Sequence, residues 1–185
     1  RARGFGLTVI AERKPGRKPE TEARIRAAGV KLVDGLDEMI RGSDIISVHV
    51  PGDASTAGLV DADFLAKMKP GAILLNTSRG EMVDEAALIA AMDAKGIRAG
   101  LDVFCDEPGG GTAEFTSALA QHPNVVGTHH IGASTQQAQD ATASGSIDVI
   151  EAYRAGDLLN CVNVSPTRIG TATIIIRHFD RVGVL

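Results

Sequence analysis

Short apolar runs alternate with helical stretches along most of the chain, and this alternation constrains the fold more than any other feature. The runs predict strands at 7–11, 30–33, 45–50, 72–75, 99–104, 125–127 and 171–176. Runs that are apolar without interruption, rather than alternately apolar and polar, are typical of parallel strands covered on both faces. The pattern therefore predicts an α/β fold built on a doubly wound parallel sheet.

The segments between the runs carry start and stop signals for helices. Helices are predicted at 20–28, 36–41, 61–67, 84–94, 115–120 and 134–155. Asp84 is suited to cap a helix start, because its side chain can accept from a free backbone N–H group. Gly96 and Gly156 stand where helices are expected to end, because glycine accepts the left-handed conformation found there.

The last predicted helix is the longest, and it has its own start signal. Ser134, followed three residues later by Gln137, matches a capping box. Apolar side chains recur at helical spacing along this helix, and they include Ile147, Ile150 and Tyr153. We expect this apolar face to be buried.

The composition excludes several classes of partner and site. With 44% hydrophobic residues and a net charge of -4, the chain offers no basic surface for nucleic acid or for an anionic membrane. No apolar run approaches the roughly 20 residues of a membrane span. Cys105 and Cys161 lie far apart and outside any metal-binding spacing, so neither a disulfide framework nor a metal site is predicted. A reducing, cytoplasmic location is expected.

Polar clusters follow three predicted strands, at 76–79, 102–107 and 128–134. The carboxyl ends of parallel strands gather at one edge of a sheet, so side chains that are distant in sequence can converge there. In the first cluster, Arg79 offers a planar, permanently charged group that suits a carboxylate ligand. A surface salt bridge is the alternative, and it would be favoured if this arginine stood alone.

Glu107 and His130 follow neighbouring predicted strands and are expected to meet at the same edge. A carboxylate beside an imidazole fixes the tautomer of the ring and stabilises its protonated form, as general acid-base catalysis requires. A solvated loop histidine is the alternative, and the adjacent His129 complicates the choice. A nucleophile elbow, G-x-S-x-G, and a zinc motif, H-E-x-x-H, are both absent, so hydride transfer with a dinucleotide is the chemistry that remains.

Three segments resemble the signature segments of the D-isomer-specific 2-hydroxyacid dehydrogenases, in the same order and at similar spacing. They are residues 76–88 (NTSRGEMVDEAAL), 101–108 (LDVFCDEP) and 128–135 (THHIGAST). The resemblance covers about residues 4–164 and implies a Rossmann-type NAD-binding domain of an oxidoreductase. Within this family, residues 131–139 (IGASTQQAQ) and the tail at 177–185 are most similar to D-3-phosphoglycerate dehydrogenases with an ACT regulatory domain. That likeness implies 3-phosphoglycerate as substrate and a role in serine biosynthesis.

The resemblance also assigns roles to individual residues. Arg79 would hold the carboxylate and carbonyl oxygen of the substrate, His130 would exchange the proton, and Glu107 would tune His130. The residues implied to line the nicotinamide dinucleotide are Val50, Pro51, Thr56, Thr77, Asp102, Gly132 and Ala133. His129 departs from the family pattern, which has proline before the catalytic histidine, and is expected to change the stiffness of the loop.

The choice of coenzyme is left open by a second departure. NAD enzymes of the family carry an acidic residue after the strand at 7–11, whereas Arg13 occupies that position here, with further basic residues at 14, 17 and 18. A cation there suits the 2′-phosphate of NADP. A solvated basic turn explains the same residues equally well, so NAD with an NADP alternative is the prediction.

The resemblance further predicts the domain organisation. Residues 1–164 would form a nucleotide-binding domain that lacks its first strand and glycine-rich turn, so the sequence is expected to be a fragment. Residues 165–170 would be a linker, and 171–185 would open an ACT-like domain in which His178 and Asp180 meet an amino-acid effector. A homo-oligomer, dimer or tetramer, is expected. A non-catalytic dinucleotide-binding module and a dehydrogenase for glycerate or lactate are the alternatives.

Overall fold

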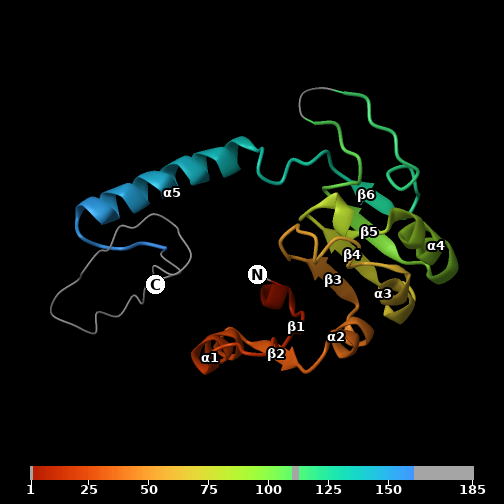
Figure 1. Ribbon diagram of the computed structural model, residues 1–185, viewed down its shortest axis with the longest axis horizontal. Helices are drawn as coiled ribbons and strands as arrows, with labels where there is room; N and C mark the ends of the chain where they lie inside the picture. Colours follow the sequence, from red (N-terminus) through yellow and green to blue (C-terminus); the bar gives the residue numbers. More distant parts are fainter. Residues whose placement is uncertain (1, 110–112, 161–185) are drawn as a thin grey trace. The chain divides into compact units, whose positions relative to one another are not determined.

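The computed structural model describes residues 2–109 and 113–160 of the 185-residue chain, which divides into two compact units at Ser134. The first unit holds every strand that is described (Figure 1). The strands are β1 Val9–Glu12, β2 Val30–Val33, β3 Ile45–Val48, β4 Ile73–Asn76, β5 Arg98–Leu101 and β6 Val125–Gly127. The helices are α1 Pro19–Ala27, α2 Leu36–Gly42, α3 Ala62–Lys67, α4 Glu85–Lys95 and α5 Gln136–Arg154, with 3-10 turns η1 Ala2–Phe5 and η2 Gly80–Met82. The predicted α/β fold with parallel strands is confirmed.

The larger sheet aligns the carboxyl ends of its four strands in one row. Its order is β3-β4-β5-β6, and every pair is parallel. Val48, Asn76, Leu101 and Gly127 end these strands, and each is the register partner of the next. The polar segments that follow β3, β4, β5 and β6 therefore all start from the same edge.

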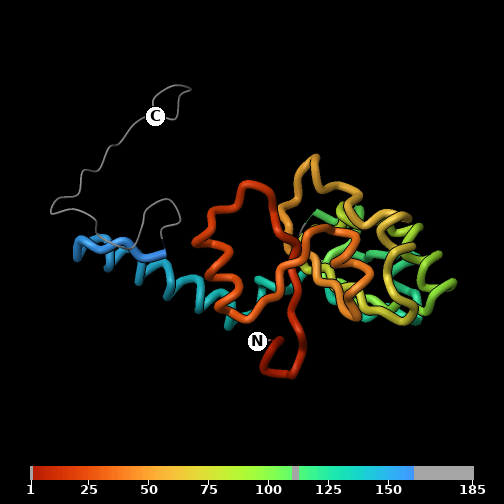
Figure 2. The backbone as a smooth tube through the Cα atoms, turned by 90° about the horizontal axis from the view of Figure 1, so that it is seen from below, coloured from red at the N-terminus to blue at the C-terminus, as the bar shows by residue number. Residues whose placement is uncertain are grey.

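The sheet is broken between β1 and β3. Strands β1 and β2 form a separate parallel pair, and Figures 1 and 2 both show the red β1-α1-β2 segment beside the part that runs from orange at β3 to teal at β6. A doubly wound sheet has one further strand between these positions, which precedes β1 in the chain order. Helix α2 packs against β1, β2 and α3, so it joins the two sheets across the break.

An aliphatic core holds the first unit together. Leu74 of β4, Leu88 and Met92 of α4, Met82 of η2 and Ile97 are all at most 1% exposed. Burying side chains of this size stabilises a fold by roughly 1.5–3 kcal/mol each. The core therefore fixes β4, η2 and α4 against one another, and these elements flank the candidate site.

The helix boundaries follow the predicted caps with one exception. The Asp84 side chain accepts from the N–H of Ala87 at 2.9 Å, and Gly96 ends α4 with a φ of 66°. The prediction that Ser134 caps α5 is wrong, because Thr135 is the cap and accepts from the N–H of Ala138 at 3.2 Å. The Ser134 N–H donates instead to the carbonyl of Ile131 at 3.0 Å, so Ser134 completes the preceding turn.

Two other predicted elements differ from those observed. The helix predicted at 115–120 is a turn, because the Ser117 hydroxyl takes the N–H groups of Leu119 and Ala120 that a helix would use. Strand β5 ends at Leu101 rather than at residue 104, because its partner β6 ends at Gly127.

The second unit consists, within the described residues, of α5 and a short segment to residue 160. No residue of α5 is buried, and Ile147, Ile150 and Tyr153 are 52–60% exposed, so the predicted burial of this face is not observed. Among the residues described, no helix is both long and apolar enough to cross a membrane. The predicted linker at 165–170 and ACT-like segment at 171–185, with His178 and Asp180, lie outside the described residues.

Candidate active site

A buried amide shapes the turn that carries Arg79. Asn76 ends β4 and is fully buried; its Oδ1 accepts from the Ser78 N–H at 3.0 Å, and its Nδ2 donates to the Arg79 carbonyl at 2.8 Å. The Ser78 hydroxyl donates to the carbonyl of Val48 at 2.9 Å, which ties the turn to β3. The arginine is therefore held through its backbone, while its side chain stays exposed.

The Arg79 side chain extends beside Gly52. A Cβ atom at position 52 would lie 2.6 Å from Arg79 Cγ, so a glycine is needed for this approach. The Nη1 atom donates to the Ser78 carbonyl at 2.7 Å. Within the described part of the chain, no carboxylate forms an ion pair with this guanidinium, which leaves it able to bind an anionic ligand.

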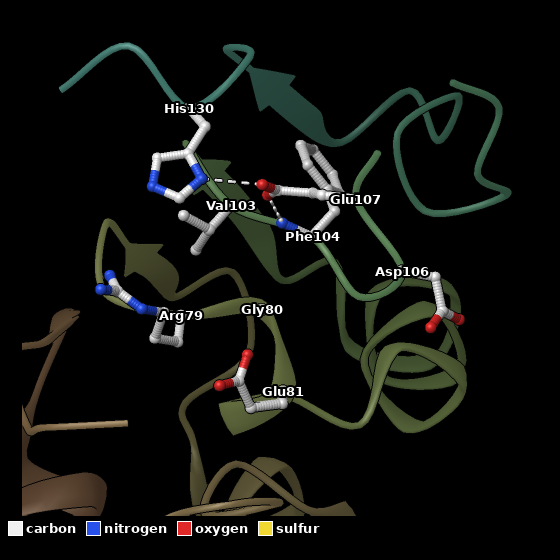
Figure 3. Close-up of a pocket in the computed structure, with 8 residues that line it drawn as sticks. All are labelled: Arg79, Gly80, Glu81, Val103, Phe104, Asp106, Glu107 and His130. Carbon is white, nitrogen blue, oxygen red and sulfur yellow. Dashed lines mark hydrogen bonds and ion pairs between the residues drawn. The ribbon is translucent and has the colours of Figure 1, made fainter. Parts of the chain in front are cut away.

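Glu107 and His130 form a direct pair, as Figure 3 shows. His130 Nδ1 lies 2.7 Å from Glu107 Oε2, and Glu107 Oε1 accepts from the Phe104 N–H. Because an ionised carboxylate can only accept, Nδ1 carries the proton in this contact. The other ring nitrogen, Nε2, faces away from Glu107 on the side of the Arg79 guanidinium. Proton exchange with a ligand is therefore available at Nε2.

The turn that carries His130 is held by the Asp102 carboxylate. His130 has a φ of 58°, a conformation that few residues other than glycine adopt without support. Asp102 is 7% exposed, and its side chain accepts from the Thr128 hydroxyl and from the N–H groups of Ile131 at 2.9 Å and Gly132 at 3.0 Å. Its carbonyl accepts from the His130 N–H at 2.8 Å. One residue thus holds the turn on both sides of the histidine.

This arrangement sets the ionisation of Asp102. Burial alone raises the pKa of the carboxyl group, but hydrogen bonds from the Thr128 hydroxyl and two backbone N–H groups outweigh burial. The nearby His130 lowers the pKa further, so the pKa of Asp102 lies below its ordinary value of 3.8. The carboxylate is accordingly charged at neutral pH and stabilises the folded state.

We expect Asp102→Asn to destabilise the chain by about 1.5–3 kcal/mol at neutral pH, because an amide cannot accept all three of these hydrogen bonds. A depressed folded pKa adds stability above the unfolded pKa, and this is lost as the pH falls through the folded pKa. The difference from wild type in urea unfolding should therefore shrink below about pH 4. Asp106→Asn, at an exposed carboxylate, is the control; a difference that stays constant in acid would contradict the assignment.

A cavity of about 250 Å³ lies between the Arg79 and Glu107 segments. It is lined by Arg79, Gly80, Glu81, Val103, Phe104, Asp106, Glu107 and His130 (Figure 3). The structure thus brings the predicted arginine, glutamate and histidine into one pocket. A permanently charged guanidinium can bind the carboxylate of a small acid, and an imidazole paired with a carboxylate can move a proton to or from that acid. The described residues contain no group of three or more potential metal ligands.

The residues expected to line a dinucleotide lie along the same sheet edge but outside this pocket. Val50 and Pro51 follow β3, and Thr56 donates its hydroxyl to the Pro51 carbonyl at 2.6 Å. Thr77 follows β4 and is exposed, as are Gly132 and Ala133 after β6. The carboxyl edge of a parallel sheet is where dinucleotides bind, so these residues fit that ligand. Asp102 differs from them, because hydrogen bonds inside the protein occupy its carboxylate.

Arg13 lies apart from these residues, at the end of β1. Its guanidinium contacts Asp34 at 2.9 Å and Glu22 at 3.7 Å. The neighbouring Lys14 contacts Glu12 at 2.8 Å. A cation that is already paired with carboxylates of neighbouring elements is less available to a 2′-phosphate, so these ion pairs favour the alternative without a bound phosphate.

Two positions at this site are not apparent from sequence patterns. A Cβ atom at Gly80 would lie 2.0 Å from the carbonyl oxygen of Phe104, so only glycine fits there. The Glu85 carboxylate accepts from the N–H of Cys105 at 2.8 Å. The only signals in the sequence are the glycine directly after Arg79 and the glutamate directly after the Asp84 cap.

Comparison with known proteins agrees with this geometry. Residues 1–132 match the family model of the NAD-binding domain of D-isomer-specific 2-hydroxyacid dehydrogenases. The chain is 42% identical to a D-3-phosphoglycerate dehydrogenase of Mycobacterium tuberculosis, covering 89% of this chain and 30% of the relative. It is 40% identical to glyoxylate/hydroxypyruvate reductase B of Enterobacter agglomerans, covering 86% of this chain and 47% of the relative.

The fold of the chain is also similar to that of solved dehydrogenase structures. D-lactate dehydrogenase with NAD⁺ from Lactobacillus jensenii is similar with a TM-score of 0.65 and 31% identity, covering 88% of this chain and 50% of that one. The chain thus spans between about a third and a half of the length of these relatives. The family expected from the three signature segments is confirmed. The chain belongs to the D-isomer-specific 2-hydroxyacid dehydrogenases and carries the NAD-binding domain of that family.

Proposed function

We propose that this protein transfers a hydride between a D-2-hydroxyacid and NAD, with Arg79, Glu107 and His130 as its catalytic residues. The observation that supports this most is the pocket in which the guanidinium of Arg79 faces the His130-Glu107 pair. An arginine alone could form a surface salt bridge, and a histidine alone could be a solvated loop residue. Together, in an NAD-binding domain, they supply what hydride transfer needs from the protein.

In the oxidation direction, the Arg79 guanidinium binds the substrate carboxylate through paired N–H donors and orients C2. His130 Nε2 removes the proton of the C2 hydroxyl, so the C2 oxygen becomes a carbonyl as the C2 hydrogen leaves with its electron pair. Glu107 stabilises the imidazolium that forms. The residues along the carboxyl edge of the sheet would hold NAD⁺, which would supply the hydride acceptor. In the reverse direction His130 donates the same proton.

Within this class we propose 3-phosphoglycerate as the substrate, with NAD rather than NADP as the coenzyme. The similarity to phosphoglycerate dehydrogenases at 36–42% identity supports the substrate. The 40% identity to a glyoxylate/hydroxypyruvate reductase makes an unphosphorylated hydroxyacid the second candidate. The ion pairs of Arg13 with Asp34 and Glu22 support NAD. A homo-oligomer with an amino-acid effector at the ACT-like tail remains part of the proposal.

Arg79→Gln should raise the KM for the acid substrate by roughly 10- to 150-fold, because a hydrogen bond to a charged group contributes about 1.5–3 kcal/mol. The KM of Arg79→Lys should lie between those of the wild type and Arg79→Gln, since an ammonium group keeps the charge but not the planar pair of donors. Steady-state kinetics of the intact protein with 3-phosphohydroxypyruvate, hydroxypyruvate and glyoxylate measures this effect and ranks the substrates.

The affinity for NADH is the matched control, because Arg79 acts on the acid and not on the coenzyme. It should stay the same in both arginine variants. An unchanged KM in Arg79→Gln would contradict the proposed role. Binding of NADH without turnover of any hydroxyacid or oxoacid would instead favour a non-catalytic dinucleotide-binding module.

A further inference from the structure

Glu85 lies outside the catalytic pocket but contacts the connection between β5 and β6 at two places. It is the first residue of α4 and is half-buried. Its Oε1 accepts from the N–H of Cys105 at 2.8 Å, and its Oε2 accepts from the hydroxyl of Ser117 at 3.3 Å. The shorter contact reaches the segment that carries Glu107.

Adjacent N–H groups of that segment are each held by a carboxylate. Glu107 Oε1 accepts from the Phe104 N–H, and Glu85 Oε1 accepts from the Cys105 N–H. The other oxygen of Glu107 contacts His130 Nδ1 at 2.7 Å. The two N–H groups belong to consecutive peptides that share Phe104. A shift of the Phe104-Cys105 peptide would therefore displace Phe104, and with it the N–H group that holds the carboxylate of Glu107.

Gly80 packs directly against the peptide between Phe104 and Cys105. A Cβ atom at position 80 would lie 2.0 Å from the Phe104 oxygen and 2.6 Å from the Cys105 nitrogen. Gly80 follows Arg79 directly, so this contact is where the arginine turn meets the glutamate segment. The Phe104-Cys105 peptide is thus held between Gly80 and Glu85.

We propose that Glu85 is a positioning residue that holds the Phe104-Cys105 peptide against Gly80 and so sets the place of Glu107 relative to Arg79. This inference rests on the proposed function for its effect on catalysis. The ionised carboxylate suits its place, because the N-terminus of a helix stabilises negative charge. Burial, followed by the nearby Glu85 charge, raises the pKa of Cys105 to about 11, so the neighbouring thiol stays neutral.

A glutamate in the first turn of a helix also stabilises that helix through its charge, and the test must separate this role from positioning. Glu85→Gln loses the charge but keeps an oxygen that can accept from Cys105. Glu85→Asp keeps the charge but draws the carboxylate back by one methylene group. Ser117→Ala is the control. It removes the longer contact of Glu85, together with the hydrogen bonds from the N–H groups of Leu119 and Ala120 to the Ser117 hydroxyl, but leaves the contact between Glu85 and Cys105 in place.

In the intact protein, Glu85→Asp should lower kcat by roughly 10- to 100-fold with the KM for NADH unchanged, since small misplacements of reacting groups cost this much. Glu85→Gln and Ser117→Ala should keep kcat close to that of the wild type. The ¹⁵N resonance of His130 Nδ1, which reports its contact with Glu107, should shift in Glu85→Asp toward its position in Glu107→Gln.

The reverse pattern, with an impaired Glu85→Gln and a normal Glu85→Asp, would assign Glu85 to helix charge alone and overturn the proposal. An unmoved His130 resonance in Glu85→Asp would overturn it as well. The resonance needs no turnover, so it tests the positioning role even if the wild-type protein proves to have no dehydrogenase activity. In that case the proposed function fails while the proposal for Glu85 is still decided.

Discussion

His130→Asn is expected to reduce turnover by roughly 10²- to 10⁴-fold, the usual contribution of a general acid-base group. The amide of asparagine cannot take up or release the hydroxyl proton at neutral pH. Asparagine also tolerates the left-handed backbone, so the φ of 58° at this position can persist. The His130 side chain is 51% exposed, and its N–H donates to the carbonyl of Asp102 through the backbone. Stability and NADH affinity should therefore change little.

Steady-state and single-turnover rates of the intact variant, measured beside its NADH affinity and thermal midpoint, check this expectation. Glu107→Gln is the companion variant, and it should lose less than His130→Asn because the imidazole remains. His129→Asn is the control at the neighbouring exposed histidine, and it should leave the chemical step intact. Near-normal turnover in His130→Asn would remove His130 from the mechanism.

Gly80→Ala is expected to have the second large effect, on both stability and catalysis. The added methyl carbon would lie 2.0 Å from the Phe104 oxygen and 2.1 Å from its carbonyl carbon, and backbone atoms cannot rotate aside. Overpacking of this kind destabilises proteins by about 1–3 kcal/mol. Relief of the clash would have to separate the Arg79 turn from the Glu107 segment, so kcat should fall even under conditions where the variant is fully folded.

Urea unfolding and kcat of the same preparations test this prediction. Gly109→Ala is the matched control, because a Cβ atom at Gly109 would meet nothing within 4 Å and the residue lies in the same β5-β6 connection. It should behave like the wild type in both measurements. A Gly80→Ala variant as stable and active as the wild type would contradict the prediction, because the Arg79 turn and the Glu107 segment could then separate without loss of stability or kcat.

The sequence allows the strands and the catalytic candidates to be predicted because both follow local rules. Continuous apolar runs mark the strands β2, β3 and β4 within two residues of their observed ends. Once the strands are placed, the parallel register brings Arg79, Glu107 and His130 to one edge without further information. The pocket thus follows from strand order and from the residue types that come after each strand.

Contacts between loops leave no comparable pattern. Gly80 and Glu85 both contact the Phe104-Cys105 peptide, which lies about 20 residues further along the chain. No periodicity or capping rule predicts these contacts from the sequence. Asp102 has a structural contact that no sequence pattern indicates, because its carboxylate accepts hydrogen bonds from the turn that carries His130. The contact with the dinucleotide that the family resemblance implies for Asp102 stays a prediction.

The division of the strands into two sheets leaves the candidate site intact. Among the described residues, no strand lies between β1 and β3 in a sheet, and each of the two sheets forms its own parallel ladder. Because the four-stranded sheet carries the row of strand ends, the candidate pocket forms without the β1-β2 pair. Arg13, at the end of β1, is the predicted site residue that the break separates from the others.

The central claim is that Arg79, Glu107 and His130 support hydride transfer at C2 of a D-2-hydroxyacid. Its most direct test is to incubate the intact protein with 3-phosphohydroxypyruvate and with hydroxypyruvate, using NADH in which both hydrogens at C4 are deuterium, and to analyse the product by mass spectrometry. We predict one deuterium at C2 of the D-configured hydroxyacid, and labelled product should form roughly 10²- to 10⁴-fold more slowly in His130→Asn. A product without deuterium, or labelled product formed at the wild-type rate by His130→Asn, would contradict the claim.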